Sequence, residues 1–445
     1  MASTRITRTL SANGDKKLTI SAWIKRGNIS VAQYICRVFS DGNNQGGLYF
    51  TSGDNIEWFD YVGGAYKLRY ITNAVYRDTS AWYHILAHFD NSLGSPEAKL
   101  YVNGVEQSLS TSTNYTQNQT TSWNNNYTFD IGSAATGTYF DGSMTHFYFI
   151  QNQKYAPTTF GETDSTSGIW KPITSPTIDY SATGSNSCLL KFENSGNMDL
   201  DSGSNNVSFT TSGNLTQNVD TPSNNFNTLN GIGVRASNFT LSNGNSSATC
   251  GADWETLEGT LGVNKGKWYY EAKWNGSNYF MAGWTSTNFM SKVPTSYVGH
   301  TITEPSYALG LNDAKVYYST SSSATQDSAV WGNTLTSSDI LGCAIDIDNG
   351  KLYWSKNGVW MNSGDPTSGA TGTGAYSITD TATNYFWQPV MGCYNSAGNF
   401  NFGQGYFGTT AVASANADDG GLGIMEYDVP ANYRVLCTKN IKDYG

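Results

Sequence analysis

The sequence of 445 residues is long enough for two or three domains at roughly 150 residues per domain. Its composition, with 14% aromatic and only 13% charged residues, differs from the low hydrophobicity and high net charge of disordered chains. The formal net charge of −10, without a cluster of Lys and Arg, argues against a nucleic-acid partner, because phosphate binding needs a basic surface. No apolar run approaches the ~18 residues of a membrane-spanning helix, so we expect no membrane insertion.

Short segments in which apolar and polar residues alternate predict a first β-sandwich over residues 1–156. They follow one another at intervals of about 8 to 15 residues with polar turns between them, which is typical of sandwiches. The expected strands lie at residues 18–24, 37–40, 47–51, 56–61, 82–89, 99–102, 124–130 and 144–150.

Residues 157–229 are rich in Thr, Ser, Asn and Pro, which favour turns and exposed backbone, and we interpret them as a connector. One strand is expected inside it, at residues 188–192. Because a structureless loop of this length is uncommon in a compact protein, we expect the connector to be ordered against the first sandwich.

A second β-sandwich is predicted over residues 230–445, and its clearest element is a hairpin within residues 341–360. The turn Asp348-Asn349-Gly350 suits a tight hairpin because Asn and Gly adopt positive φ at little cost. A related unit lies at residues 98–105 of the first domain. We therefore expect an all-β fold of two tandem jelly-roll-like β-sandwiches joined by a polar connector.

The cysteines are scattered, with no C-x-x-C spacing, which favours reduced thiols packed as small apolar side chains over a metal site or a disulfide frame. The first eight residues lack the apolar core of a signal peptide, so we expect synthesis in a cytoplasm. The six cysteines are Cys36, Cys188, Cys250, Cys343, Cys393 and Cys437.

Residues 21–26, 82–85, 99–105 and 131–150 resemble, in this order, a laminin-G/concanavalin A-like lectin domain. The later part of the chain resembles a SPRY domain, because its blocks also occur in the order of SPRY strands. These blocks lie at residues 266–273, 281–284, 307–310, 339–346, 352–358, 387–392 and 399–404.

Residues 160–172, 220–226 and 427–440 resemble a group of tailed-bacteriophage proteins, common in marine phages, that join such a lectin-like domain to a SPRY domain. The resemblance implies a structural protein on the virion surface, made in the host cytoplasm in several copies or as a homo-oligomer. Other virion proteins and a host cell-surface glycan would be its partners, and it would serve in a tail fibre or an outer decoration. Two alternatives stay open: a purely architectural virion protein and a polysaccharide-degrading tailspike.

Candidate catalytic residues are few. A glycoside hydrolase needs two carboxylates flanking the bond that it cleaves, and Glu162 and Asp164 offer the alternating acids that concanavalin-type hydrolases use. Ser167 stands where a further Glu would be expected, so we predict no enzymatic activity. His84 and His88 are expected to pack within a sheet rather than to bind a metal.

Binding residues are sought among the polar loops of the first domain. Trp58, Tyr61, Tyr66 and Trp123 provide aromatic rings beside Asn, Asp and Gly turns and are our candidates for a sugar platform, although most tryptophans belong to a core.

Calcium is the one cofactor that the laminin-G resemblance suggests. Asp54 resembles the position of one calcium ligand, and Asp41 and Asn43 lie on a neighbouring turn. The alternative is that these residues only stabilise turns, without any cofactor.

Overall fold

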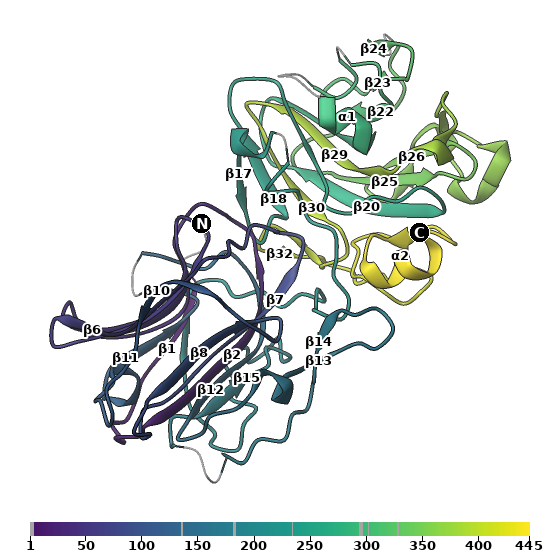
Figure 1. Cartoon of the computed structure of the whole chain (residues 1–445). Coiled ribbons are helices and arrows are strands. Elements are labelled where there is room, and N and C mark those ends of the chain that lie inside the picture. Colours follow the sequence, from purple (N-terminus) through teal and green to yellow (C-terminus); the bar gives the residue numbers. More distant parts are fainter. Residues whose placement is uncertain are drawn as a thin grey trace. The chain divides into compact units, whose positions relative to one another are not determined.

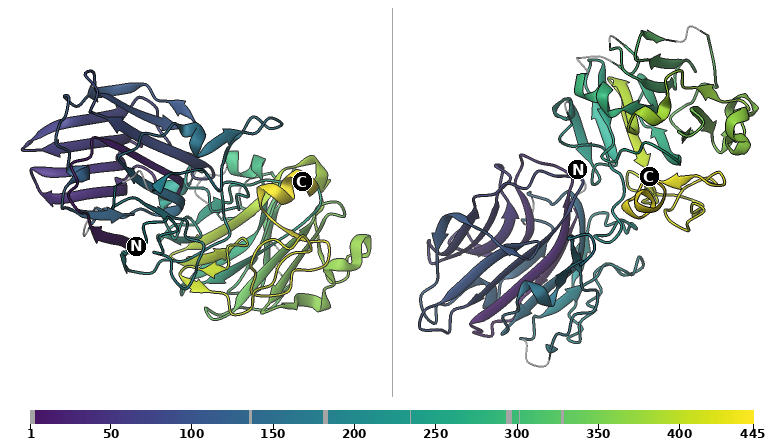
Figure 2. Two further views of the ribbon diagram at one scale, coloured as in Figure 1. Left: turned by 90° about the horizontal axis from the view of Figure 1, so that it is seen from below. Right: turned by 45° about the vertical axis from the view of Figure 1, so that its right-hand side comes forward.

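The computed structural model describes residues 4–134, 137–180, 184–233, 235–292, 297–300, 302–326 and 329–445. The chain divides into two compact units, residues 1–217 and 218–445, each built from two layers of strands (Figures 1 and 2). The predicted all-β fold is confirmed, with only two short α-helices in the described ranges, α1 (Thr287–Lys292) and α2 (Thr438–Tyr444). In this part of the chain no helix combines the length and apolar character needed to cross a membrane.

The first layer of the first unit is an eight-stranded sheet whose described contacts are antiparallel. In the order of their pairing, its strands are β10 (Leu109–Thr113), β6 (Ala65–Thr72), β5 (Ile56–Val62), β4 (Asn44–Phe50), β3 (Gln33–Asp41), β11 (Thr128–Ile131), β1 (Arg5–Thr9) and β16 (Thr210–Ser212).

The second layer is a six-stranded sheet, and the core of the first unit lies between the two layers. Alternate residues of each strand, such as Leu18 and Ile20 in one sheet and Leu48 and Phe50 in the other, point into this core and are fully buried. Burial of each such side chain contributes about 1.5–3 kcal/mol. The strands of this sheet, in pairing order, are β15 (Cys188–Leu190), β12 (Gly142–Gln151), β2 (Lys17–Arg26), β7 (Trp82–Asp90), β8 (Glu97–Val102) and β9 (Val105–Glu106).

The segment interpreted as a connector is ordered against the first sandwich and largely belongs to it. Strands β15 and β16 each extend one of its sheets, and the hairpin of β13 (Gly161–Thr163) and β14 (Trp170–Pro172) lies beside the six-stranded sheet. Phe160 packs on Tyr148 of β12 with ring centroids 4.9 Å apart. The first compact unit therefore extends past the predicted boundary at residue 156 as far as residue 217, and residues 218–229 belong to the second unit.

The second unit also contains two main sheets. Its nine-stranded sheet contains β17 (Phe239–Ser242), β18 (Ser247–Cys250), β30 (Ala397–Asn401), β20 (Lys267–Trp274), β25 (Ile340–Asp346), β26 (Lys351–Lys356), β27 (Val359–Trp360), β28 (Tyr376–Ser377) and β33 (Arg434–Val435). Its six-stranded sheet contains β19 (Glu255–Glu258), β29 (Trp387–Tyr394), β21 (Tyr279–Ser286), β22 (Ser306–Gly310), β23 (Val316–Ser319) and β24 (Ala324–Gln326). A separate short hairpin is formed by β31 (Tyr406–Phe407) and β32 (Thr410–Ala411).

The hairpin predicted within residues 341–360 is confirmed as β25 and β26, which pair from Leu341–Lys356 to Asp346–Lys351. Gly350 in the turn has φ +63°, a value that glycine adopts without strain. Asp346 is buried and pairs with Lys267 at 2.9 Å, so this carboxylate links the turn to the neighbouring strand β20.

The expectation that all cysteines are free thiols is wrong for one pair. Cys250 of β18 and Cys393 of β29 form a disulfide that joins the two main sheets of the second unit. The spacing of the sequence could not reveal it, because 143 residues separate the partners. The other cysteines are buried thiols, as expected: Cys36, Cys188, Cys343 and Cys437.

Candidate functional site

The outer side of the eight-stranded sheet, facing away from the core, carries a row of aromatic rings on β3 to β6. The strand period of two explains it: Leu48 and Phe50 of β4 are fully buried, whereas Tyr49 between them points outward and is half-buried. We name this surface the aromatic face and define it by Tyr34, Arg37, Phe39, Gln45, Tyr49, Glu57, Phe59, Tyr61, Tyr66 and Arg69.

The rings of the aromatic face contact one another from strand to strand. Tyr34 and Tyr49 are stacked, with centroids 4.5 Å apart and planes 7° from parallel. Phe59 meets Tyr49 edge-on at 6.0 Å and Tyr66 at 6.1 Å. Tyr61 meets Tyr66 at 4.9 Å. Each such pair contributes about 0.5–1.5 kcal/mol beyond its buried area, so the row is held in place before any ligand arrives.

Gly47 of β4 lets two of these rings lie close against the sheet. A Cβ atom at this position would stand 2.6 Å from the Phe59 ring and 2.7 Å from the Tyr34 ring, both shorter than real Cβ contacts. Because glycine has no Cβ, the rings of two strands close over the backbone of β4.

Charged groups are placed among the rings. Glu57 accepts a hydrogen bond from the Tyr49 hydroxyl at 2.7 Å and from Arg69 Nε at 2.8 Å. The Arg69 guanidinium lies 4.6 Å from the centroid of Tyr66. Burial, followed by the hydrogen bond to Glu57, raises the pKa of Tyr49, so this phenol stays neutral and donates. The face thus combines flat apolar rings with fixed polar groups.

Two of the four predicted sugar-binding residues, Tyr61 and Tyr66, lie on the aromatic face, and Tyr66 is 42% exposed. The other two predictions are wrong. Trp58 is fully buried beside Tyr70 and Phe89 in the core, because side chains alternate along β5 and that of Trp58 points to the inner side. Trp123 is fully buried and covers the inner side of Gly46.

The sequence prediction missed most of the aromatic face. Tyr34, Tyr49, Phe59, Arg37 and Arg69 were not among the candidates, although alternation along β4 and β5 already places Tyr49, Glu57 and Phe59 opposite the core residues. The period of two was the signal that could have found them.

The residues proposed for calcium do not form one site. Asp54 is fully buried, and its carboxylate lies 3.1 Å from Arg26 and 2.8 Å from Arg77 and accepts a hydrogen bond from the Ser30 amide at 2.7 Å. Burial opposes its charge, but the hydrogen bonds from Arg77 and Ser30 outweigh this effect and lower the pKa of Asp54. Two guanidinium groups therefore occupy the surroundings in which a calcium ion would need oxygen ligands.

Asp41, the last residue of β3, and Asn43, in the turn that follows, lie at the other end of β4 from Asp54. Asp41 accepts hydrogen bonds from the Asn43 amide at 2.7 Å and from the Asn44 side chain at 3.1 Å, which is a turn-stabilising arrangement. Within the described ranges, no group of three or more His, Cys, Asp or Glu residues is placed to hold a metal ion.

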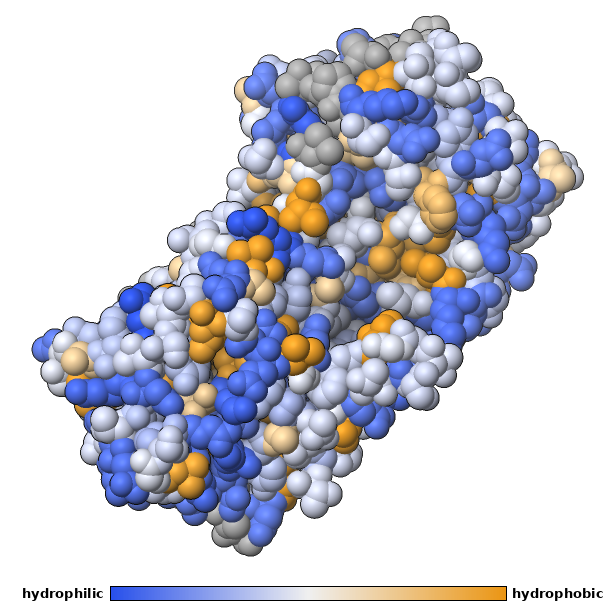
Figure 3. Space-filling view, in the orientation of Figure 1, coloured by the Kyte–Doolittle hydropathy of each residue, from blue (hydrophilic) through white to orange (hydrophobic). Residues whose placement is uncertain are grey.

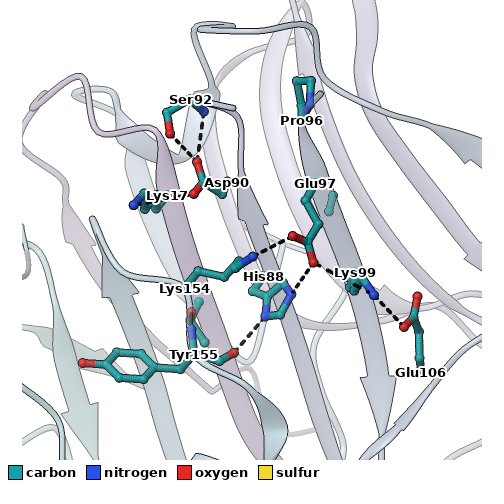
Figure 4. Close-up of polar contacts among 12 residues, drawn as sticks. Lys17, His88, Asp90, Ser92, Pro96, Glu97, Lys99, Glu106, Lys154 and Tyr155 are labelled. Carbon is teal, nitrogen blue, oxygen red and sulfur yellow. Dashed lines mark hydrogen bonds and ion pairs between the residues drawn. The ribbon is translucent and has the colours of Figure 1, made fainter. Parts of the chain in front are cut away.

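A second polar cluster lies on β7 and β8 (Figure 4). Glu97 pairs with Lys154 at 2.6 Å, Lys99 pairs with Glu106 at 2.9 Å, and His88 Nδ1 lies 2.8 Å from the Tyr155 carbonyl oxygen. Burial lowers the pKa of His88, which favours its neutral form. These contacts tie the chain after β12 to the sheet, so we assign the cluster a structural role.

The remaining candidates also make structural contacts. Glu162 and Asp164 lie at 3.4 and 3.1 Å from the Lys171 amine on the β13–β14 hairpin. His84 accepts a hydrogen bond at Nδ1 from Trp170 Nε1 at 3.1 Å, and its Nε2 lies 2.8 Å from the Ser21 hydroxyl. Because the indole can only donate, the proton of neutral His84 resides on Nε2.

Apolar side chains do not form a competing broad surface on the face seen in Figure 3, where hydrophobic residues gather in small groups among hydrophilic ones. The large apolar side chains with the highest exposure are spread along the chain, from Val105 and Ile169 to Val330 and Val359. The aromatic face is therefore the strongest candidate site of the described residues.

Comparisons with known proteins cover both units. Residues 3–153 match the family model of the concanavalin A-like lectin/glucanases superfamily, in its laminin-G form, and residues 267–405 match that of the SPRY domain. A curated relative, the ATP-dependent RNA helicase DDX1 of Xenopus laevis, is 29% identical over 106 residues, which are 24% of this chain. The chain spans 12% of the length of that relative.

Solved structures add distant likenesses. The SPRY domain of human HERC1 is 13% identical with a TM-score of 0.27 and covers 36% of this chain and 91% of its own. The TRIM65 PSpry domain is 12% identical with a TM-score of 0.27 and covers 39% of this chain and 88% of its own. Stonustoxin is 19% identical with a TM-score of 0.27 and covers 39% of this chain and 27% of its own. From the two family matches, this chain contains a concanavalin A-like domain of the laminin-G type over residues 3–153, followed by a SPRY domain over residues 267–405.

Proposed function

We propose that this chain is a non-enzymatic structural and adhesion protein on the surface of a tailed-phage particle, and that its first unit binds a host cell-surface glycan through the aromatic face. The phage origin rests on the resemblance of residues 160–172, 220–226 and 427–440. The glycan partner is supported by the aromatic face, which is the single observation that carries the binding proposal.

Half-exposed rings and neutral polar groups suit a sugar. The rings of Tyr61 and Tyr66 offer flat apolar surfaces, and Gln45 and the tyrosine hydroxyls offer hydrogen bonds that contribute about 0.5–1.5 kcal/mol each. A shallow site of this kind gives a dissociation constant of about 0.1–1 mM by affinity arithmetic. Many copies on one particle raise the avidity by roughly 10² to 10⁴, so a weak single site suffices for attachment.

The test uses the full chain, tethered in many copies to a bead, in competition with phage adsorption. We expect the multivalent wild type to block adsorption, the monomer to block it poorly, and Tyr66→Ala to lose most of the effect. Tyr279→Ala is the matched control, because Tyr279 is a tyrosine of similar exposure, 47%, in the second unit.

Three results would contradict the proposal. Presence of the protein in purified virions without any competition favours the architectural role. Absence from the virion rejects both roles. Release of reducing sugars from host envelope by the purified protein favours the tailspike alternative.

A further inference from the structure

Charges on the outer side of the eight-stranded sheet do not balance. Across β1, β11, β3, β5 and β6 lie three guanidinium groups and two carboxylates. Asp130 pairs with Arg5 at 3.5 Å, and Glu57 pairs with Arg69 at 2.8 Å. Arg37 of β3 is the third guanidinium, and no carboxylate forms an ion pair with it among the residues that the structure describes.

Arg37 is nevertheless held in a defined position. Its guanidinium lies 4.2 Å from the ring centroid of Phe39 and 5.9 Å from that of Tyr34, and its Nη2 donates to Gln45 Oε1 at 2.7 Å. Asp130 is its cross-strand neighbour and attracts the guanidinium, but the ion pair of Asp130 is with Arg5. The neutral Gln45 orients the guanidinium without cancelling its charge.

From these contacts we propose that the aromatic face recognises an acidic polysaccharide, with Arg37 binding the anionic group, carboxylate or sulfate, of a sugar whose ring lies on the neighbouring tyrosines. This inference rests on the proposed glycan-binding function and names its substrate class.

The chemistry of Arg37 fits this ligand. A guanidinium presents five N–H donors in a planar fork that matches two oxygens of a carboxylate or sulfate. The hydrogen bond to Gln45 leaves Nη1 without a protein acceptor in the described part of the chain. Partial burial lowers the pKa of Arg37, which marks a cation that has lost part of its hydration and gains from an anionic partner.

A polysaccharide with one acidic group per sugar repeat also fits the aromatic face better than a nucleic acid does. The stacked pair Tyr34–Tyr49 lies beside Arg37 and can take one sugar ring. A nucleic acid would need many phosphate contacts, whereas this face offers the single guanidinium of Arg37 without an ion-pair carboxylate among the described residues.

The test is affinity electrophoresis of the full chain in gels that contain alginate, dextran sulfate or neutral dextran. We expect stronger retardation in one or both acidic gels than in dextran, and the two acidic gels separate carboxylate from sulfate. Arg37→Gln should weaken acidic binding roughly tenfold or more, since a charged hydrogen bond contributes ~1.5–3 kcal/mol. Arg37→Lys, which keeps the charge but not the fork, should fall between the two.

Lys442→Gln is the matched control, because it removes the same charge from an exposed position in the second unit and should leave retardation unchanged. Thermal unfolding of each variant verifies that it is folded. Equal retardation of wild type and Arg37→Gln in the acidic gels overturns this inference. If Tyr66→Ala nevertheless competes less with phage adsorption than the wild type, the proposed glycan binding stands without an acidic ligand. If Tyr66→Ala competes as well as the wild type, the proposed function fails as well.

Discussion

At the scale of single residues, Gly47 is the position where the aromatic face depends most on the absence of a side chain. In Gly47→Ala the new methyl group must push the rings of Phe59 and Tyr34 away from β4. Overpacking of this kind costs about 1–3 kcal/mol, so we expect a lower urea midpoint for the first unit and weaker competition with phage adsorption.

Gly42→Ala is the control for this substitution. Gly42 lies in the turn between β3 and β4, and nothing would lie within 4 Å of its Cβ. We expect the free energy of unfolding of Gly42→Ala to differ from that of the wild type by no more than about 0.5 kcal/mol. Equal midpoints for the two variants would show that the rings move aside freely and that the face is not preorganised.

Single residues also show which features of the candidate site the sequence could predict and which it could not. Tyr61 could be placed on the surface from alternation, and the same alternation places Trp58 beside Ile56 on the inner side of β5. The partners of Asp54 could not be foreseen, because Arg26 and Arg77 lie more than twenty residues away on either side and meet it only in the folded sheet. Local patterns predict the direction of a side chain but not its distant partner.

At the scale of elements, the β13–β14 hairpin is held on the six-stranded sheet by the contact between Trp170 and His84. Burial lowers the pKa of His84 to about 3, against an unfolded value of about 6.5. Between these values the unfolded chain binds the proton and the folded chain does not, so the free energy of unfolding falls as the pH drops from about 6.5 towards 3. Below about pH 3 this loss is complete.

We therefore expect His84→Gln to be less stable than wild type at pH 7 but to lose less stability on acidification, measured as urea midpoints at several pH values. The comparison with wild type is needed because Asp60, whose pKa burial raises to about 7, acts in the opposite direction and loses stability as the pH rises through this range. His300→Gln, at an exposed histidine of the second unit, is the control. Parallel pH profiles for wild type and His84→Gln would contradict this account.

The positions of many strands were easier to predict than their pairing. Strands β2 and β7, with 10 and 9 residues, were found close to their observed positions. In contrast, β15 was expected at residues 188–192 but its pairing with β12 was not, and the three-residue strand β16, which pairs with β1, was missed. These partners are distant in sequence, so composition alone made this region look like a linker. Whether two strands so far apart in the sequence pair depends on which strand edges of the folded sheet are still unpaired.

At the scale of the whole molecule, the corrected boundary changes where the chain should be cut. Residues 212–214 are exposed, and Val219 is 36% exposed, at the junction of the two units. Proteolysis concentrates at exposed polar segments, whereas residues 157–212 contribute β15 and β16 to the sheets of the first unit. We expect brief digestion with subtilisin to give two stable fragments that end and begin within residues 212–220, identified by intact mass.

A stable fragment that ends near residue 156 would contradict this boundary, because it would lack the strand β15 that pairs with Phe147 to Phe149 of β12 and the strand β16 that pairs with β1. The fragments also separate the proposed activities. If the first fragment, presented in many copies, competes with adsorption as well as the full chain does, binding resides in the aromatic face. If only the second fragment competes, attachment belongs to the SPRY domain and the assignment of the glycan site is wrong.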